Sequence, residues 1–377
     1  MDQLVSAQAE IEPTVAPTLT TRIRAGRSAF LDGLLRPSLV AVFVALALCL
    51  GVMIAAATLI TEQAMMAQGA ALFAQDPLDD YAFASSEALR FQRQPPVGAH
   101  VALIGTAALR EGLTVGGDIA ARLAQRLGHP MPVVDFMSGG QSGIETAALA
   151  ESLGPDFRGI LVLGISLSRL AADSSELGGL VREPRLAFVS AAGDAEIRAN
   201  GFEPPHRTGN YLIDNYKFFV ARYRPILWHL LSGTAPVHDT RTYLGRPAAD
   251  TAEWASDALI LKARLSHYQE RAEGNLGSLD RLIRLFPDRN KVQIVLMEIP
   301  LNPRAMDQVI GRAFVEAHRA RVQAFARREG VVYWDLNPTA GLLPADFQDW
   351  AHINSAHAQD RWTSQMVERL IPLIQNP

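Results

Sequence analysis

The residues of this chain best suited to chemistry are an aspartate and a histidine three positions apart near its end, Asp349 and His352. They fall in the stretch Asp-Trp-Ala-His-Ile-Asn (349–354), before a last amphipathic segment. A carboxylate can orient an imidazole ring and stabilise its charged form, so the pair could serve as the general base for a hydroxyl nucleophile. The alternative is a satisfied surface histidine beside a helix-capping aspartate.

A metal site is another use for these side chains. Asp349, His352, His357 and Asp360 have spacings that match no compact ligand set, and the single cysteine, Cys49, lies in the most apolar segment. The glycine pair at 116–117 lacks the three-glycine fingerprint of a dinucleotide loop. We therefore expect no metal, no cofactor and no intrachain disulfide.

The composition describes a globular chain. Its 377 residues are 49% hydrophobic and 20% charged, enough for one large core or two modest ones. The net charge of −4 provides no basic field for a phosphate backbone, so nucleic acid is not an expected partner.

An uncharged run over residues 37–61 predicts one transmembrane helix. As a helix these residues would extend roughly 37 Å, more than the ~30 Å of hydrocarbon in a bilayer. A buried core helix and a signal peptide are the alternatives, but the apolar part of a signal is shorter and starts nearer the N-terminus. Basic residues precede the run and acidic residues follow it, which predicts a span of the plasma (inner) membrane with a cytoplasmic N-terminus and a periplasmic or extracellular C-terminal domain. The basic residues are Arg22, Arg24, Arg27 and Arg36, and the acidic ones are Glu62, Asp76, Asp79, Asp80 and Glu87.

The rest of the chain divides by composition. Residues 1–36 form a polar arm, and 62–96 are expected to be a stalk that ends in Gln-Pro-Pro. From 97 to 377 short apolar runs alternate with helical patterns, with strands expected at 100–105, 132–137, 159–166, 292–300 and 331–336, and helices at 115–127, 144–153, 307–328 and 356–370. This order predicts an α/β domain with a parallel sheet covered on both faces, a three-layer arrangement.

The alternation stops over about 167–285, which reads as a helical insertion. Within it, 211–231 mixes aromatic, aliphatic and basic residues. Such a segment suits a helix on a membrane surface or against a partner, but aromatic residues at helical spacing more often face a core, and we favour a core-facing helix kinked before Pro225.

Polar and glycine residues follow several of the expected strands. Thr106 and Ala107 follow the first strand, Gly139 and Gly140 the second, and Ser166 closes the third. Ligand sites of parallel sheets lie at these carboxyl ends. Together with Asp349 and His352 after the last strand, these residues predict one site at one edge of the sheet.

These blocks resemble those of the SGNH/GDSL hydrolase superfamily, and within it the membrane-anchored DltD-like and alginate-acetylation-like proteins. The resemblance covers about 97–166 and 290–377 and implies a flavodoxin-like SGNH domain. It implies that His352 is the general base and that Asp349 orients it. It also implies that Gly139 or Gly140 donates a backbone N–H to the oxyanion, and of these two we choose Gly140. Ser166 would stand where the family has an oxyanion asparagine, and Asn354 completes an intact Asp-x-x-His-x-Asn block.

The chain departs from the family at the nucleophile. The Gly-x-Ser block aligns with Gly105-Thr106-Ala107, so the serine position is Ala107. Three interpretations stay open: a natural pseudoenzyme, an introduced Ser→Ala replacement, or chemistry that uses water or Thr106. Because adjacent residues in an extended turn point in different directions, Thr106 is a poor substitute for the serine.

The resemblance implies two functions. One is acyl transfer, most specifically acetyl transfer, to or from an extracellular polysaccharide, alongside a multi-span acyltransferase or glycan synthase. The other is a non-catalytic glycan-binding or assembly subunit of an exopolysaccharide or cell-envelope machine, for which Trp350 would offer an aromatic platform and Asn354 a further substrate contact. Whether the chain is an enzyme depends on Ala107.

Overall fold

The computed structural model describes residues 38–73, 80–95, 97–232 and 242–375, and the chain falls into two compact units, 1–59 and 60–377. In the first unit, helix α2 (Leu39–Leu59) has 21 residues, a mean hydropathy of 2.9 and no buried residue. It is the single described helix that is long and apolar enough to cross a membrane, and it lies within the expected span over 37–61. The identity of the membrane and the orientation of the chain stay predictions.

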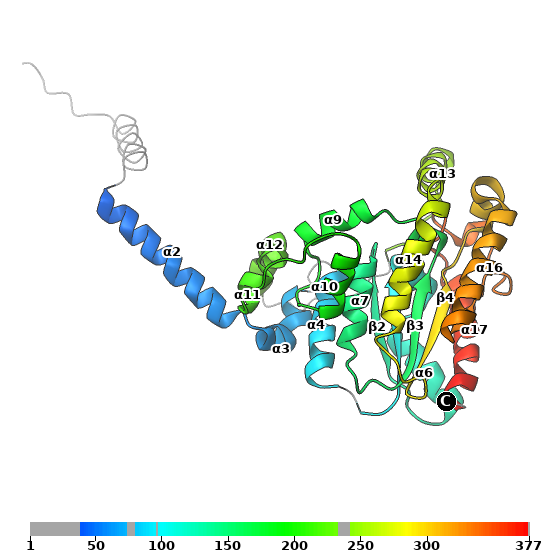
Figure 1. The fold of residues 1–377 in the computed structure, drawn as a ribbon, viewed down its shortest axis with the longest axis horizontal. Helices are drawn as coiled ribbons and strands as arrows, with labels where there is room; N and C mark the ends of the chain where they lie inside the picture. Colours follow the sequence, from blue (N-terminus) through cyan, green and yellow to red (C-terminus); the bar gives the residue numbers. More distant parts are fainter. Residues whose placement is uncertain (1–37, 74–79, 96, 233–241, 376–377) are drawn as a thin grey trace, which may run out of the picture. The chain divides into compact units, whose positions relative to one another are not determined.

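The second unit is built on five parallel strands (Figure 1). They are β1 (His100–Thr106), β2 (Val133–Ser138), β3 (Gly159–Ile165), β4 (Val292–Glu298) and β5 (Val332–Trp334). Their order in the sheet is β2-β1-β3-β4-β5, the order of a flavodoxin-like doubly wound fold. The predicted α/β class with a parallel sheet is confirmed.

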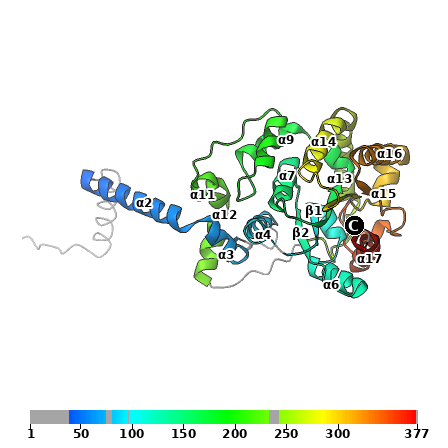
Figure 2. The same cartoon turned by 60° about the horizontal axis from the view of Figure 1, so that its bottom comes forward.

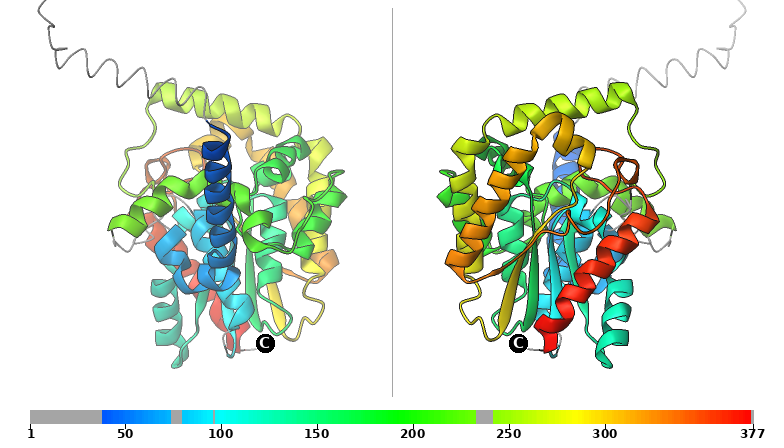
Figure 3. Two further views of the ribbon diagram at one scale, coloured as in Figure 1. Left: turned by 90° about the vertical axis from the view of Figure 1, so that its left-hand side faces the viewer. Right: turned by 90° about the vertical axis from the view of Figure 1, so that its right-hand side faces the viewer.

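Helices cover both faces of this sheet because successive strand residues point to opposite sides. In β1, Ala102 and Ile104 join one apolar cluster, and Val101 and Leu103 join another. The first cluster includes side chains of α4 (Asp80–Arg93), α7 (Gly143–Ser152), α14 (Tyr268–Ile283) and α16 (Arg312–Glu329). The second includes α6 (Gly116–Leu127) and α17 (Ala356–Gln375), which lie side by side in Figure 3. The unit therefore has the three expected layers.

Further helices lie between and around these elements (Figure 2). The described ones are α3 (Glu62–Phe73), α5 (Ala107–Gly112), α8 (Leu167–Leu170), α9 (Ser174–Arg182), α10 (Ala191–Ala199), α11 (Tyr211–Asp214), α12 (Tyr216–Ser232), α13 (Thr251–Leu265) and α15 (Pro303–Ala305), with a π-helical turn over Met306–Ile310 and a 3₁₀ turn over Pro344–Asp346. Helices α8 to α14 occupy the range predicted as a helical insertion.

Part of the expected stalk over 62–96 belongs to the folded unit instead. Helix α4 buries Tyr81, Ala84, Ala88 and Leu89 in the first apolar cluster. Their spacing of three, four and one residues places them on one helix face, a pattern that the Pro-rich end of the segment obscured. The compact unit begins at Ile60 rather than at residue 97.

Two other helices differ from expectation. The helix predicted over 307–328 begins at Arg312, because Gly311 at φ +88° breaks it from the preceding π-helical turn. The segment 211–231 is two helices that meet at Asn215. Its Phe218 and Phe219 are buried in the first cluster, which agrees with the core-facing interpretation for this part of the segment.

Candidate functional site

The carboxyl ends of β1, β2 and β3 meet closely beneath helix α5. Thr106 is in register with Ser138 of β2. A Cβ on Gly105 would lie 3.3 Å from the Cα of Gly164 and 2.9 Å from Leu109 Cδ2. Only glycine at this position lets the two strand ends approach with Leu109 packed across them. This packing fixes the start of α5, and therefore half-buried Ala107, at the edge of the sheet.

Asp349 and His352 form a hydrogen-bonded pair. The ring Nδ1 of His352 lies 2.6 Å from Asp349 Oδ2, and Asp349 Oδ1 accepts the backbone N–H groups of Ala351 and His352, both at 2.8 Å. Because an ionised carboxylate only accepts, Nδ1 carries the proton and Nε2 keeps its lone pair. Within the described residues Nε2 makes no hydrogen bond, so the imidazole is oriented as a general base would be.

The segment after β4 holds this pair at the same edge of the sheet. Buried Asn302 donates its backbone N–H to Trp350 O at 3.0 Å and its side-chain amide to Asp349 O at 2.8 Å. Since the strands are parallel, the end of β4 and the end of β1 lie at one edge. The dyad and the Ala107 turn share that edge, while a direct pairing of His352 with the Ala107 position stays a prediction.

Tyr243, which the sequence did not single out, stacks on the histidine. Its ring centroid lies 4.2 Å from that of His352, with 8° between the planes. The preceding residue, Thr242, donates its N–H to Glu111 Oε1 of α5 at 3.1 Å. Buried Glu111 thus connects the helix that begins at Ala107 with the aromatic ring that covers His352.

The electrostatics around the dyad favour a charged carboxylate. Burial alone would raise the pKa of Asp349, but the hydrogen bond and charge of His352 and two backbone N–H groups outweigh burial and lower it. Burial, with Asp349 and Glu253 adding repulsion, raises the pKa of Asp257 on α13. The lowered pKa keeps Asp349 ionised at neutral pH, as an acceptor for the His352 Nδ1–H requires.

Asp349→Asn should lower the free energy of unfolding by roughly 1–2 kcal/mol at neutral pH, because it removes a charged, hydrogen-bonded acceptor. A carboxyl group whose folded pKa is depressed stabilises the fold above its unfolded pKa of about 3.9, and the contribution disappears as pH falls through the folded pKa. Urea unfolding in detergent should therefore show a gap in unfolding free energy between the unaltered chain and Asp349→Asn at neutral pH, and this gap should disappear in acid. Exposed Asp156→Asn is the control, and a gap of equal size at both pH values would contradict this account.

The turn after β2 distinguishes the two glycines considered as oxyanion donors. The N–H of Gly139 donates to Asp80 Oδ2 at 2.8 Å and is therefore occupied. Gly140 has φ +59°, and its N–H has no acceptor within the described part of the chain. Gly140 therefore keeps the free donor that the predicted oxyanion role requires.

Ser166 and Thr106 have different surroundings from those expected. Ser166 Oγ accepts the Arg169 N–H at 3.0 Å as the N-cap of α8 and shares a hydrogen bond with Ser168 Oγ at 3.0 Å, so a structural role accounts for this hydroxyl. Thr106 is half-buried and lines a 140 Å³ cavity beside Gly140. His352 does not line that cavity, which gives no support to Thr106 as a substitute nucleophile.

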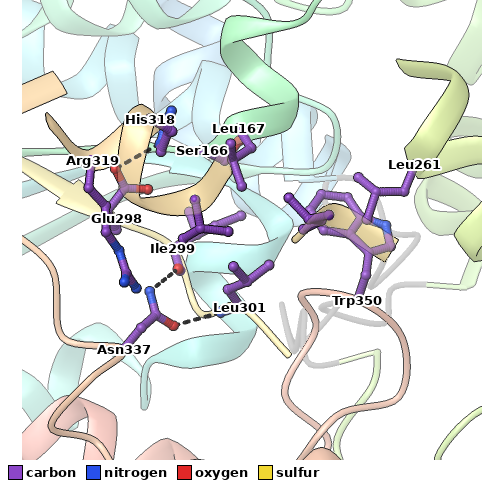
Figure 4. Close-up of a pocket in the computed structure, with 12 residues that line it drawn as sticks. Ser166, Leu167, Leu261, Glu298, Ile299, Leu301, His318, Arg319, Asn337 and Trp350 are labelled. Carbon is purple, nitrogen blue, oxygen red and sulfur yellow. Dashed lines mark hydrogen bonds and ion pairs between the residues drawn. The ribbon is translucent and has the colours of Figure 1, made fainter. Parts of the chain in front are cut away.

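The two predicted substrate contacts lie largely in packed surroundings. Trp350 is half-buried against both apolar clusters and borders a cavity of only 20 Å³ with Ser166 and Glu298 (Figure 4). Asn354 is buried, and its amide donates to Arg246 O at 2.8 Å, which holds the Tyr243 segment beside the dyad. Packing and loop attachment explain both side chains, and their substrate contacts stay predictions.

No group of three potential metal ligands occurs among the described residues. Asp360, considered above with the dyad, instead pairs with Arg122 at 2.6 Å. The residues that the sequence analysis missed, Tyr243 and the buried carboxylates Asp80 and Glu111, reach the site through contacts remote in sequence. The one signal that could have marked them was the charged pair Arg110-Glu111 directly after the Ala107 turn.

Comparisons with known proteins add little to this description. No family model matches the chain, and no curated protein matches it. Among solved structures, a presumed acylhydrolase from Bacteroides fragilis NCTC 9343 is 10% identical, with a TM-score of 0.35 over 76% of this chain and 94% of that one. So distant a likeness carries no information about the activity or substrate of this chain.

Proposed function

We propose that this chain is a membrane-anchored SGNH-like protein that serves acyl transfer, most specifically acetyl transfer, to or from an extracellular polysaccharide, and that it binds the acyl ester or its acceptor without attacking it. The carrying observation is the contrast at one sheet edge: Asp349 and His352 form a 2.6 Å hydrogen bond, while Ala107 stands in the nucleophile position.

In this proposal the site keeps a general base and an oxyanion donor, but it lacks a nucleophile. His352 offers a free Nε2 and Gly140 a free N–H at the edge where Ala107 begins α5. Loss of the serine from a triad costs on the order of 10⁶ in rate, whereas loss of one oxyanion donor costs about 10²–10³. The bond-breaking step of the proposed system therefore belongs to a partner, for which a multi-span acyltransferase is the fitting class.

The anchor supports an envelope location for this role. Helix α2 has a mean hydropathy of 2.9 and is fully exposed, as a span facing lipid would be. The basic residues before it and acidic residues after it favour a cytoplasmic N-terminus, with residues 60–377 outside.

A second candidate is an assembly subunit that acts through a surface rather than through the dyad. Helix α12 favours it, because Val220 and Tyr223 are exposed while Phe218 and Phe219 anchor the same helix in the core. Exposed apolar side chains on an anchored helix suit contact with a partner.

Complementation of a deletion strain separates the two candidates. We expect His352→Ala to abolish polymer acetylation while Val220→Ser with Tyr223→Ser leaves it intact, because the first role depends on the dyad. The reverse result would establish the assembly role and overturn the first proposal. In the same cells, protease added outside spheroplasts should cleave the 60–377 unit, and full protection would contradict the topology.

A further inference from the structure

A polar cavity lies beside the Ala107 turn, and neither Asp349 nor His352 lines it. Its volume is 140 Å³, and it is bordered by the end of β1, the start of α7, and helices α8, α9 and α14. At 10–15 Å³ for each water it holds roughly ten waters, too little for a polymer but enough for one substituent. Its walls carry mostly hydrogen-bonding groups, among them Thr106, Ser142, Ser168, Arg169, Asn200 and Asn275.

Arg169 brings a positive charge to this cavity without a direct counterion. Its Nη1 donates to Gly164 O at 3.3 Å and its Nη2 to Thr146 Oγ1 at 2.8 Å, both neutral oxygens. Within the described residues no carboxylate lies within 4.0 Å of the guanidinium. Burial lowers the pKa of Arg169 to about 10, and attraction from Glu196 and Glu145 offsets that effect only in part. The side chain thus stays charged at neutral pH and keeps three of its five N–H donors.

The three carboxylates in the cavity wall are already paired with other arginines. The pairs and their N–O distances are Asp173–Arg271 at 2.6 Å, Glu176–Arg264 at 2.9 Å and Glu196–Arg281 at 2.8 Å. Glu145, the more distant acid near Arg169, is paired with Arg185 at 2.5 Å. The surplus charge of the cavity is therefore the single positive charge of Arg169.

The start of helix α7 adds to this positive potential. Ser142 and Gly143 line the cavity, and α7 is a ten-residue helix that begins at Gly143. The N-terminus of such a helix carries a partial positive charge. A capping box between Ser142 and Glu145 pairs the N–H groups of these two residues, and among the described residues the N–H of Gly143 at the first helical position has no acceptor. A guanidinium without a counterion and a helix N-terminus that face one polar cavity form an anion site.

We propose that this cavity binds an oxyanion, a carboxylate or phosphate group carried by the ligand, with Arg169 as its main partner. Arg169 donates to Gly164 O, and Gly164 lies against Gly105 directly before Thr106 and Ala107. An anionic substituent held there would place the rest of its ligand across the Ala107 turn. The inference depends only on the cavity and holds whether or not Ala107 marks a vacated nucleophile.

Thermal unfolding of the full chain in detergent micelles tests the site with two probes, sodium acetate and inorganic phosphate, each titrated to about 100 mM against sodium chloride of equal ionic strength. We expect at least one oxyanion to raise the unfolding midpoint beyond chloride. The acetate and phosphate arms separate the carboxylate from the phosphate source. A midpoint that responds to neither anion beyond chloride overturns the proposal.

Four variants test whether the response comes from the cavity. Arg169→Gln should weaken the apparent Kd at least tenfold, Arg169→Lys should retain part of the response, and Arg126→Gln, on the exposed surface of α6, should retain all of it. Ser168→Asp places a carboxylate in the cavity beside Arg169, so this chain should fold but lose the response. An undiminished response in Arg169→Gln, or in Ser168→Asp if the first variant does not fold, would exclude the Arg169 cavity as the site.

Discussion

Ala107→Ser is expected to turn this chain into one that a fluorophosphonate probe labels covalently and that hydrolyses p-nitrophenyl acetate. The replacement puts a hydroxyl at the first residue of α5, at the same edge of the sheet as the His352 ring, whose Nε2 makes no hydrogen bond within the described residues. Ala107 is half-buried, so one added oxygen should be tolerated. Removal of a triad serine costs on the order of 10⁶ in rate, so even partial recovery should lie several orders of magnitude above the unaltered chain.

Two further changes in the Ala107→Ser background test the mechanism. His352→Ala should abolish labelling, because no base then activates the hydroxyl. Asp349→Asn should reduce hydrolysis by about 10⁴, since the amide favours the wrong imidazole tautomer. Thr106→Val is the control and should leave labelling unchanged, because Thr106 lines the Arg169 cavity, which His352 does not line. A folded Ala107→Ser chain that stays unlabelled, or one labelled equally without His352, would show that the Ala107 turn and the dyad do not form one site.

The sheet was predictable from the sequence because its strands are continuous apolar runs buried on both faces. Val101 to Ile104 in β1 and Ile160 to Leu163 in β3 are buried throughout, a pattern typical of central parallel strands. Helix α4 was missed because the segment that contains it ends in Gln94-Pro95-Pro96, a composition typical of a linker. Its membership in the core depends on tertiary packing rather than on local composition.

The dyad could be predicted because it is local. Asp349 and His352 lie three residues apart, so one loop brings them together. Tyr243 lies more than 100 residues before His352, and no motif marks it. Arg169 was equally hidden, because its significance depends on which neighbouring acids already have partners, and that information exists only in the folded chain.

Asp80→Asn is expected to destabilise the 60–377 unit by about 3 kcal/mol, because it leaves the buried guanidinium of Arg110 without its main counterion. Arg110 and Asp80 are each 4% exposed and form an ion pair. Burial disfavours the charged arginine, but attraction to Asp80, and to Glu111 and Asp135 beyond it, raises the pKa of Arg110. The expected cost is at the low end for a broken buried pair because Glu111 remains 3.3 Å from Arg110.

Glu368→Gln provides the matched control, because it breaks the pair between Glu368 and Arg126, whose side chains are 52% and 54% exposed. An exposed pair contributes about 0–1 kcal/mol, so urea unfolding should separate the two variants clearly. Equal, small losses would show that Asp80 and Arg110 are not a buried pair in solution. Because Asp80 also accepts the Gly139 N–H at 2.8 Å, its loss should loosen the turn that presents Gly140. In the Ala107→Ser background, Asp80→Asn should therefore slow hydrolysis while Glu368→Gln does not, which would connect the stability of this buried pair with the geometry of the site.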